Sequence, residues 1–351
     1  MLNLTKTQKI CIQYGFLLLL ICMTVYLVST TLDITLIPMI IKLVNKKFIF
    51  IGFLIMVLYI ILECTIINIL IKTIQKTKVR FLAVKIAMMG FYYNLVTPFA
   101  SGSQPMQIYA LNKYDINLSK SIAIVTNKTV LFQTVVTIYS AVIIFLNIEV
   151  LKNELPSMLV LMSIGMVMNI VSLLGGMLIV LTPNTMKIIV KVIVNILYRL
   201  NIFKSLNKKI HTINKFIDEY SYSIKLFIKN KKALFLSIIL TIIQLTVFFS
   251  ISYCVYKAFI LNGLSIFEVL SLQVFLYMSV SPIPTPGNVG ANEVAFLTIF
   301  ANVFPGNIIG YSVFLYSIYV YYFLVVVCGV FTIHTHYHMN KRKNKNRNYS
   351  L

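Results

Sequence analysis

Charged residues are scarce in this sequence, and their scarcity excludes an ordinary soluble domain. Only 11% of the 351 residues are charged, whereas a soluble domain contains about 25%. Hydrophobic residues make up 59% of the chain, and the mean hydropathy is +0.89. This composition predicts a polytopic membrane protein.

Acidic residues are scarcer still, with nine Asp and Glu against 31 Lys and Arg, so that the formal net charge is +22. Such a balance often accompanies nucleic-acid binding. Here, however, the basic residues lie between apolar stretches rather than on a soluble face. The positive-inside rule and attraction to anionic head groups explain them better, so we expect a membrane partner and no nucleic acid.

Cysteine, histidine and the common catalytic patterns offer little chemistry. The five cysteines are scattered through apolar segments without metal-ligand spacing, which indicates neither disulfides nor a zinc site. In the run His334, His336 and His338, only the first and last would share a helix face, so we interpret the run as interfacial and solvated. No Ser-His-Asp order, carboxylate pair, phosphate-binding loop or dinucleotide fingerprint occurs. We therefore predict no catalytic residue, no metal and no cofactor.

Six apolar stretches are long enough to cross a bilayer, which takes about 17–25 residues. They cover about 10–28, 48–71, 121–147, 157–181, 234–256 and 311–333. The first is longer than the core of a cleaved signal peptide, which has about 7–15 residues, so we interpret it as a retained helix.

Basic residues orient these spans. Three segments are rich in Lys and Arg and are expected in the cytoplasm together with both termini: 72–85, 182–233 and 341–347. Segments 148–156 and 257–268 carry few basic residues and are expected outside. The loop 29–47 disagrees with this topology, because it should be outside yet holds three lysines against one aspartate.

Two further regions, 84–118 and 266–304, are apolar but broken by proline, and they contain five of the nine prolines. Proline breaks a helix, and the freed backbone groups must be buried in protein or line a wet cavity. Counting crossings makes 84–118 enter and leave from the cytoplasm and 266–304 from the outside. We therefore predict an all-α fold of six full spans plus two re-entrant hairpins of opposite orientation, an arrangement typical of transport sites.

The membrane domain is predicted to cover residues 1–340. Within it, 186–232 alternates isoleucine-rich patches with lysines, which favours helices lying on the cytoplasmic interface, with a solvated helical hairpin as the alternative. Residues 341–351 form a basic cytoplasmic tail. We expect a multi-pass protein of the cell membrane.

Three ionisable residues fall at membrane depth, where such groups are costly and are candidates for function. Glu63 lies near the middle of the second span, where a hydrogen-bonded structural role competes with a functional one. Lys128 lies about one-third into the next full span, and it could snorkel or meet either a lipid phosphate or Glu293. Glu293 begins a half-helix, where the helix dipole favours a carboxylate, so helix capping is the alternative to substrate binding.

The remaining candidate residues surround the two breaks. Amide side chains supply donors and acceptors, glycines allow a tight turn or close approach of a head group, and N–H groups at half-helix starts suit phosphate. Together with Lys128 and Glu293, the predicted substrate-binding residues are Asn94, Pro98, Gly102, Gln104, Pro286, Gly287, Gly290 and Asn292.

The breaks also resemble the signatures of a known family. Asn94-x-x-x-Pro98, continued by Gly102-Ser-Gln-Pro-Met-Gln-Ile-Tyr, is similar to the first signature of the lysylphosphatidylglycerol synthase transmembrane (flippase-like) family. Pro284-Thr-Pro-Gly-Asn-Val-Gly-x-x-Glu293 resembles the second, and Asn127-Lys128 occupies the position of the family's acidic-or-polar-plus-basic pair. Lysine stands there in place of the usual arginine. The resemblance covers nearly the whole chain.

This resemblance implies a membrane domain that moves aminoacylated phosphatidylglycerol to the outer leaflet, which lowers surface negative charge and gives resistance to cationic peptides. In full-length members a cytoplasmic aminoacyltransferase domain lysylates the lipid from charged transfer RNA. We find no segment long enough for that domain, so transferase activity is not expected of this chain by itself.

Several functions remain open at this point. The first is translocation of an aminoacylated phospholipid such as lysyl-phosphatidylglycerol, or help in making and displaying it, with Glu293 attracting the lysyl ammonium and Lys128 holding the phosphate. Movement of another isoprenoid- or glycan-linked lipid is equally compatible with a polar cavity. The others are phosphatidylglycerol lysyltransferase activity and a scaffold that recruits a separate synthase.

Overall fold

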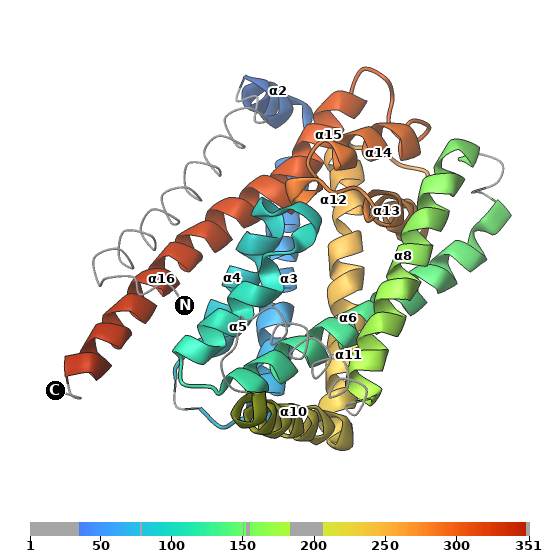
Figure 1. The fold of residues 1–351 in the computed structure, drawn as a ribbon. Coiled ribbons are helices and arrows are strands. Elements are labelled where there is room, and N and C mark those ends of the chain that lie inside the picture. Colours follow the sequence, from blue (N-terminus) through green and yellow to red (C-terminus); the bar gives the residue numbers. More distant parts are fainter. Residues whose placement is uncertain (1–34, 78, 150, 152–154, 183–205, 349–351) are drawn as a thin grey trace.

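The computed structural model describes residues 35–77, 79–149, 151, 155–182 and 206–348, and the regular structure within them is entirely helical (Figure 1). The α-helices, in chain order, are α2 (Leu36–Leu43), α3 (Lys46–Ile74), α4 (Leu82–Val96), α5 (Ser103–Lys113), α6 (Leu118–Leu146), α8 (Pro156–Leu181), α10 (Leu206–Lys229), α11 (Lys231–Phe249), α12 (Ile251–Ala258), α13 (Ile266–Val280), α14 (Ala291–Ile299), α15 (Ile309–Ser317) and α16 (Leu324–Asn348). Two short 3₁₀ turns, η1 (Pro98–Ala100) and η2 (Pro286–Asn288), and a π-helical segment, η3 (Ile318–Phe323), interrupt them.

Five helical segments of the described chain are long and apolar enough to cross a membrane. They are Lys46–Ile74, Leu118–Leu146, Met158–Leu178, Lys231–Ala258 and Ile309–Met339. Each coincides with one of the predicted spans, and the last runs continuously through α15, η3 and α16. The remaining predicted span, 10–28, lies outside the described residues.

Polar contacts define the two ends of the helix bundle. At one end, Lys120 Nζ donates to Gln75 Oε1 at 2.7 Å and lies 3.9 Å from Glu219 Oε1, which joins α3, α6 and α10. At the opposite end of α3, the Asn45 N–H donates to the Ala258 carbonyl at 2.8 Å, which joins α3 to α12. We call these the α10 end and the α12 end.

Each proline-broken region folds into two helices that pack against each other around a break. Helix α4 begins and α5 finishes at the α10 end, whereas α13 begins and α14 finishes at the α12 end (Figure 1). The two hairpins therefore approach each other from opposite ends of the bundle, and their breaks, η1 and η2, are in contact. This arrangement brings the two proline-rich breaks of the sequence to one place in the fold.

Helix α10 is amphipathic, as the sequence indicates. Its buried residues recur at helical spacing, and Tyr220 and Ile224 pack against Ala123 of α6. Of the predicted amphipathic segment 186–232, the part from residue 206 onward is described and helical. Its apolar face covers other helices of the bundle; contact with a membrane interface stays a prediction.

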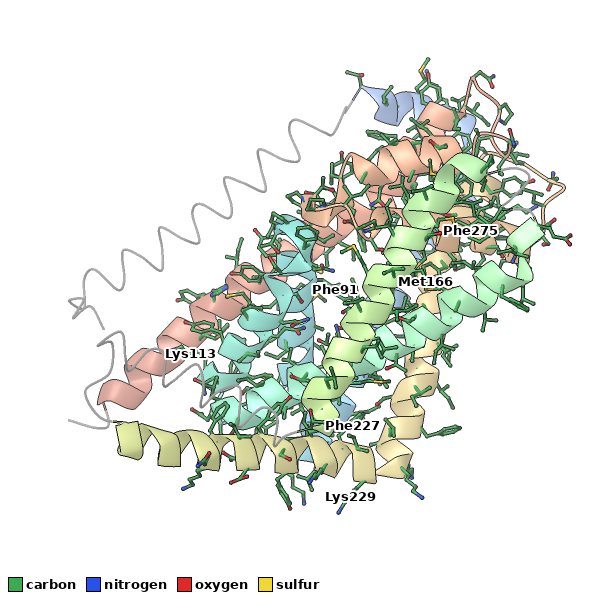
Figure 2. All side chains as sticks on the ribbon, turned by 45° about the vertical axis from the view of Figure 1, so that its right-hand side comes forward. Phe91, Lys113, Met166, Phe227, Lys229 and Phe275 are labelled. Carbon is green, nitrogen blue, oxygen red and sulfur yellow. The ribbon has the colours of Figure 1, made fainter. Side chains whose placement is uncertain are left out.

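Helices α8 and α13 are in close backbone contact. A Cβ atom placed on Gly165 of α8 would lie 1.9 Å from the carbonyl oxygen of Met278, so only glycine allows this approach. Asn169, one turn further along α8, donates to the Gly165 carbonyl at 2.8 Å and to Ser281 Oγ at 3.3 Å. Figure 2 labels Met166 on α8 and Phe275 on α13 beside this contact. Small residues at close crossings are typical of helix packing in membranes.

Candidate functional site

The two breaks have the same backbone course. In each, a proline is followed by two residues in the left-handed region: φ is 53° and 56° at Phe99 and Ala100, and 59° and 58° at Gly287 and Asn288. Helix α4 ends just before Pro98 and α13 ends just before Pro282, because proline has no N–H to donate and cannot continue a helix. Left-handed backbone at non-glycine residues costs about 1–3 kcal/mol and is concentrated at functional sites. Because the same costly turn occurs in both hairpins, which run in opposite directions, we interpret the breaks as functional parts of the fold.

Gly287 allows the second break to lie directly against the first hairpin. A Cβ atom on Gly287 would come within 2.4 Å of Tyr321 Cε2 and 2.9 Å of the Leu95 carbonyl oxygen. The break is thus held between the last turn of α4 and the π-helical segment η3. Gly287 was predicted to let the backbone turn tightly or come close to a lipid head group. In the structure its backbone lies close to the Tyr321 ring and the Leu95 carbonyl oxygen.

Gly102 closes the turn after the first break. Its N–H donates to Thr97 Oγ1 at 2.9 Å, and a Cβ atom there would lie 2.7 Å from Thr97 Cγ2. Pro98 is exposed, and the chain then enters α5 with Gln104 exposed in its first turn. The first break therefore has a fixed backbone and an open face.

Unpartnered hydroxyl groups surround the second break. Among the described residues, the buried oxygens Ser279 Oγ, Thr285 Oγ1 and Tyr321 OH have no hydrogen-bond partner. Buried polar groups are nearly always paired, and each exception needs an explanation. Tyr321 also belongs to η3, and π-helical turns occur frequently at functional sites. These hydroxyls are free to bind a polar ligand.

Glu293 caps the half-helix that follows the second break. Its Oε2 accepts from the Gly290 N–H at 2.6 Å, and its Oε1 accepts from Ser317 Oγ at 2.8 Å. Helix capping, the alternative raised from the sequence, is therefore confirmed by the contact with the Gly290 N–H. Since each carboxylate oxygen has two lone pairs, the half-buried Glu293 still has acceptor capacity and a negative charge for a cation.

The remaining predicted residues lie near these two turns with their polar groups unused. The Asn94 and Asn292 side chains are half-buried. Among the described residues, neither they nor Gln104 have a hydrogen-bond partner. Pro286 starts η2 and Gly290, with φ of 82°, precedes α14. The predicted residues of both hairpins are thus gathered around the contact between η1 and η2, with the exception of Lys128.

The charge of Lys128 is paired with Glu63 and not with Glu293, the acidic partner that the sequence had suggested. The Lys128 Nζ lies 2.7 Å from Glu63 Oε1, and Gln244 Nε2 donates to Glu63 Oε2 at 3.0 Å. The Glu63 side chain is 5% exposed and that of Lys128 is 22% exposed. A buried carboxylate requires such partners, so α3, α6 and α11 are joined by a charged cluster in the middle of three spans.

Several residues of the site were missed from the sequence. Tyr321, Ser317 and Gln244 act through partners that are distant in sequence, and nothing in their local pattern separates them from other residues of apolar helices. The histidine run also needs correction, since His336 is partly buried and its Nε2 lies 3.0 Å from Tyr93 OH, whereas His334 and His338 are exposed as predicted. Within the described residues, no group of three or more His, Cys, Asp and Glu could hold a metal ion.

Comparison with known proteins identifies the family. The model of the lysylphosphatidylglycerol synthase TM region matches residues 12–328, which is most of the chain. No curated protein and no solved structure matches the chain. The chain belongs to the lysylphosphatidylglycerol synthase transmembrane family, as its two proline-rich signatures indicate, and is a membrane protein related to the synthesis or flipping of lysylphosphatidylglycerol.

Proposed function

We propose that this family member moves an aminoacylated phospholipid, such as lysyl-phosphatidylglycerol, between the leaflets of the cell membrane and so lowers the negative charge of the outer surface. The observation that carries this proposal is the contact between η1 and η2, where two helical hairpins from opposite ends of the bundle meet beside unpartnered hydroxyls. Half-helices that meet in this way supply polar groups where ordinary spans have none.

In the membrane, the α10 end faces the cytoplasm together with both termini, and the hairpins are re-entrant. This orientation follows from the basic segments 72–85 and 182–233, whose described helical parts include the end of α3 and α10, which lie at the α10 end. The hairpin α4–α5 then enters from the cytoplasm, and α13–α14 enters from the outside. A head group can reach the contact between the breaks from either leaflet by local movement of one hairpin.

Glu293 attracts the ammonium of the lysyl group. Its carboxylate keeps acceptor capacity beyond the Gly290 N–H and Ser317 Oγ. The unpartnered Thr285, Ser279 and Tyr321 hydroxyls hydrogen-bond to the phosphate and glycerol oxygens that pass the break. Lys128, which the ion pair with Glu63 neutralises, holds a phosphate only when that pair opens. Its role is therefore secondary to that of Glu293.

The test is lipid movement in proteoliposomes, with labelled phosphatidylglycerol and lysyl-phosphatidylglycerol measured side by side. Glu293→Gln keeps an acceptor for the Gly290 N–H but loses the charge, so it separates helix capping from cation binding. We expect this variant to remain folded and to lose most movement of the lysyl lipid. Ser317→Ala removes a neighbouring donor without removing the charge and serves as the matched control.

Two outcomes would contradict the proposal. Unchanged movement of the lysyl lipid by Glu293→Gln would leave Glu293 with a capping role alone. The absence of movement of either lipid by the wild type would point to a different lipid or to a scaffold for a separate synthase. Appearance of lysyl-phosphatidylglycerol in a host that makes only this chain would instead support lysyltransferase activity.

A further inference from the structure

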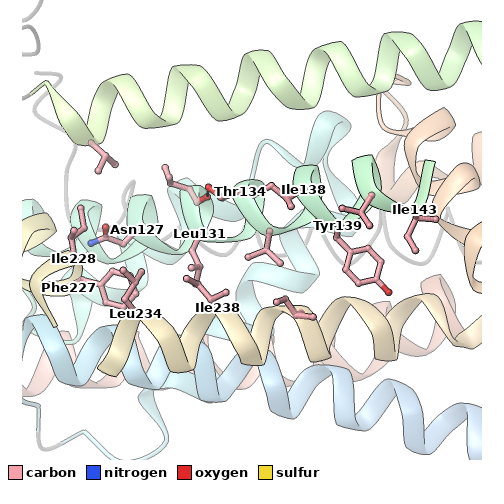
Figure 3. A pocket seen from close by; sticks show the side chains of 15 residues that line it. Asn127, Leu131, Thr134, Ile138, Tyr139, Ile143, Phe227, Ile228, Leu234 and Ile238 are labelled. Atoms are coloured by element: carbon pink, nitrogen blue, oxygen red, sulfur yellow. Dashed lines mark hydrogen bonds between the residues drawn. The ribbon is translucent and has the colours of Figure 1, made fainter. Parts of the chain in front are cut away.

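An apolar groove opens on the bundle, and none of its lining residues belongs to either break. It has a volume of about 570 Å³ and lies between α6, α8, α10 and α11 (Figure 3). Pockets that hold small ligands measure about 300–1,000 Å³. The lining residues of α6 extend from Asn127 to Ile143, which is about 24 Å along the helix. A groove this long, narrow and apolar has the shape of an extended fatty acyl chain.

One lining residue has an unsatisfied polar group. Asn127 is 4% exposed, and among the described residues its Nδ2 has no hydrogen-bond partner. It lies at the end of the groove that Phe227 and Ile228 of α10 close (Figure 3). A buried donor without a partner costs about 1–3 kcal/mol, so the groove favours a ligand with an acceptor at this end. The ester carbonyl of a glycerolipid is an acceptor placed directly above its acyl chain.

Positive charge lies just outside the same end. Phe227 and Ile228 are followed by Lys229, and Leu234, which also lines the groove, is preceded by Lys231 and Lys232. These three lysines are exposed, and among the described residues none has a carboxylate within ion-pair distance. Figure 2 labels Phe227 and Lys229 at this end of α10. The corner between α10 and α11 can therefore receive a phosphate.

We infer that this groove binds one anionic phospholipid, with an acyl chain along α6, an ester carbonyl on Asn127 Nδ2, and the phosphate at Lys229, Lys231 and Lys232. The three chemical requirements occur in the order in which a phospholipid presents them: apolar chain, neutral acceptor and anion. A soluble anion would leave the groove and Asn127 unused, and a neutral lipid would leave the lysines unused. The occupant is thus a lipid of the leaflet that faces the α10 end.

This site is independent of the proposed translocation. It shares no residue with the contact between η1 and η2, and it needs only binding. A lipid held there would bridge α10 to α6 and α11, because the lining residues come from these helices. The test below measures occupancy without transport, so its failure would leave the proposed function untouched.

The absence of tryptophan from the chain allows a direct test. Ile138→Trp places a single fluorophore in the groove, at a position that is 57% exposed. Phe145→Trp, on the same helix but outside the groove and 78% exposed, is the control. The protein is reconstituted in phosphatidylcholine vesicles that contain small fractions of phosphatidylglycerol or phosphatidylcholine with brominated acyl chains, which quench tryptophan on contact.

We expect half-quenching of the Ile138→Trp variant at a mole fraction of brominated phosphatidylglycerol on the order of tenfold below that of brominated phosphatidylcholine, because each lysine near a phosphate adds to anion preference. The Phe145→Trp variant should respond equally to both lipids. Replacing Lys229, Lys231 and Lys232 by Gln should abolish the preference, whereas the same change at Lys42, Lys46 and Lys47, at the α12 end, should not.

Asn127→Leu provides a second measurement that does not depend on charge. Both lipids have ester carbonyls, so this variant should weaken binding of both and leave their ratio unchanged. Equal quenching of the groove and control reporters, or no lipid preference at Ile138→Trp, would overturn the inference. Retention of the full preference after removal of the corner lysines would overturn the assignment of the phosphate position.

Discussion

The Nζ of Lys128 lies 2.7 Å from Glu63 Oε1, which makes an ion pair between α6 and α3 in the middle of two spans. The pair is nearly enclosed, since Glu63 is 5% and Lys128 is 22% exposed, and Gln244 of α11 completes it. Glu63 and Lys128, which are 65 positions apart in the sequence, thus neutralise each other. The attraction within such a pair is largely offset by the cost of removing both charges from water, so the pair by itself is weak evidence for stability.

Removal of one member of this pair should be more damaging than removal of both. Lys128→Met leaves an uncompensated buried carboxylate, and Glu63→Gln leaves an uncompensated ammonium, so each should lower stability by about 3 kcal/mol. The double variant should recover most of this loss because no lone charge remains. Thermal unfolding in detergent of the wild type, both single variants and the double variant gives the coupling energy. Additive losses would show that the two groups do not interact.

The docking of α10 should depend on pH through Glu219. The hydrogen bond from Ser119 Oγ, supported by Asn117 and Lys120, lowers the pKa of the Glu219 carboxyl in the folded protein. A lowered pKa means that the contribution of Glu219 to stability is fully present above its unfolded pKa of about 4.3 and is lost as the pH falls through the folded value. We expect the protection of the α10 amides against hydrogen exchange, corrected for the intrinsic exchange rate, to fall below about pH 4 relative to the rest of the bundle.

Glu219→Gln is the control for this pH effect. Its amide oxygen can accept from Asn117 while its NH2 group donates to Ser119 Oγ, but the side chain has no proton to gain. Protection in α10 should therefore no longer fall with acid relative to the rest of the bundle. Acid-induced exchange that is identical in the wild type and the variant would assign the effect to another group.

The sequence predicted the elements of the fold better than their partners. Apolar length and proline placement are local properties, and they predicted the five described spans and the position of both breaks. The partner of Lys128 could not be found in this way, because Glu63 and Glu293 are both acidic residues in apolar surroundings and only packing decides between them. The same holds for Tyr321, whose contact with Gly287 depends on how α16 and its π-helical start cross the hairpin.

The close crossing of α8 and α13 gives a prediction with a control on the same helix. Gly165→Ala would place Cβ 1.9 Å from the Met278 carbonyl, so the helices must separate, and stability should fall by about 1–3 kcal/mol. Gly175→Ala meets no atom within 4 Å and should be neutral or slightly stabilising, because alanine is the better helix former. Both variants are compared by thermal unfolding. Equal effects would mean that α8 does not pack closely at Gly165.

Two tyrosines of η3 should respond oppositely to the loss of their hydroxyl groups. Tyr319 OH donates to the Ile49 carbonyl at 3.0 Å, whereas the buried Tyr321 OH has no partner among the described residues. Tyr319→Phe therefore removes a hydrogen bond and should lower stability by about 1 kcal/mol. Tyr321→Phe removes an unsatisfied group while its ring still covers Gly287, so stability should stay the same or rise.

The two tyrosine variants should rank in the opposite order when lipid movement is measured in place of stability. If the Tyr321 hydroxyl binds passing head groups, Tyr321→Phe should slow movement of the labelled lipid several-fold in proteoliposomes, although the protein is at least as stable as the wild type. Tyr319→Phe should retain the wild-type rate per folded molecule, because its hydroxyl serves only the contact with α3. A Tyr321→Phe variant that is less stable yet moves lipid normally would show that this hydroxyl has a structural partner. A stability loss cannot imitate the expected result, since the variant that slows transport is the one that should not be destabilised.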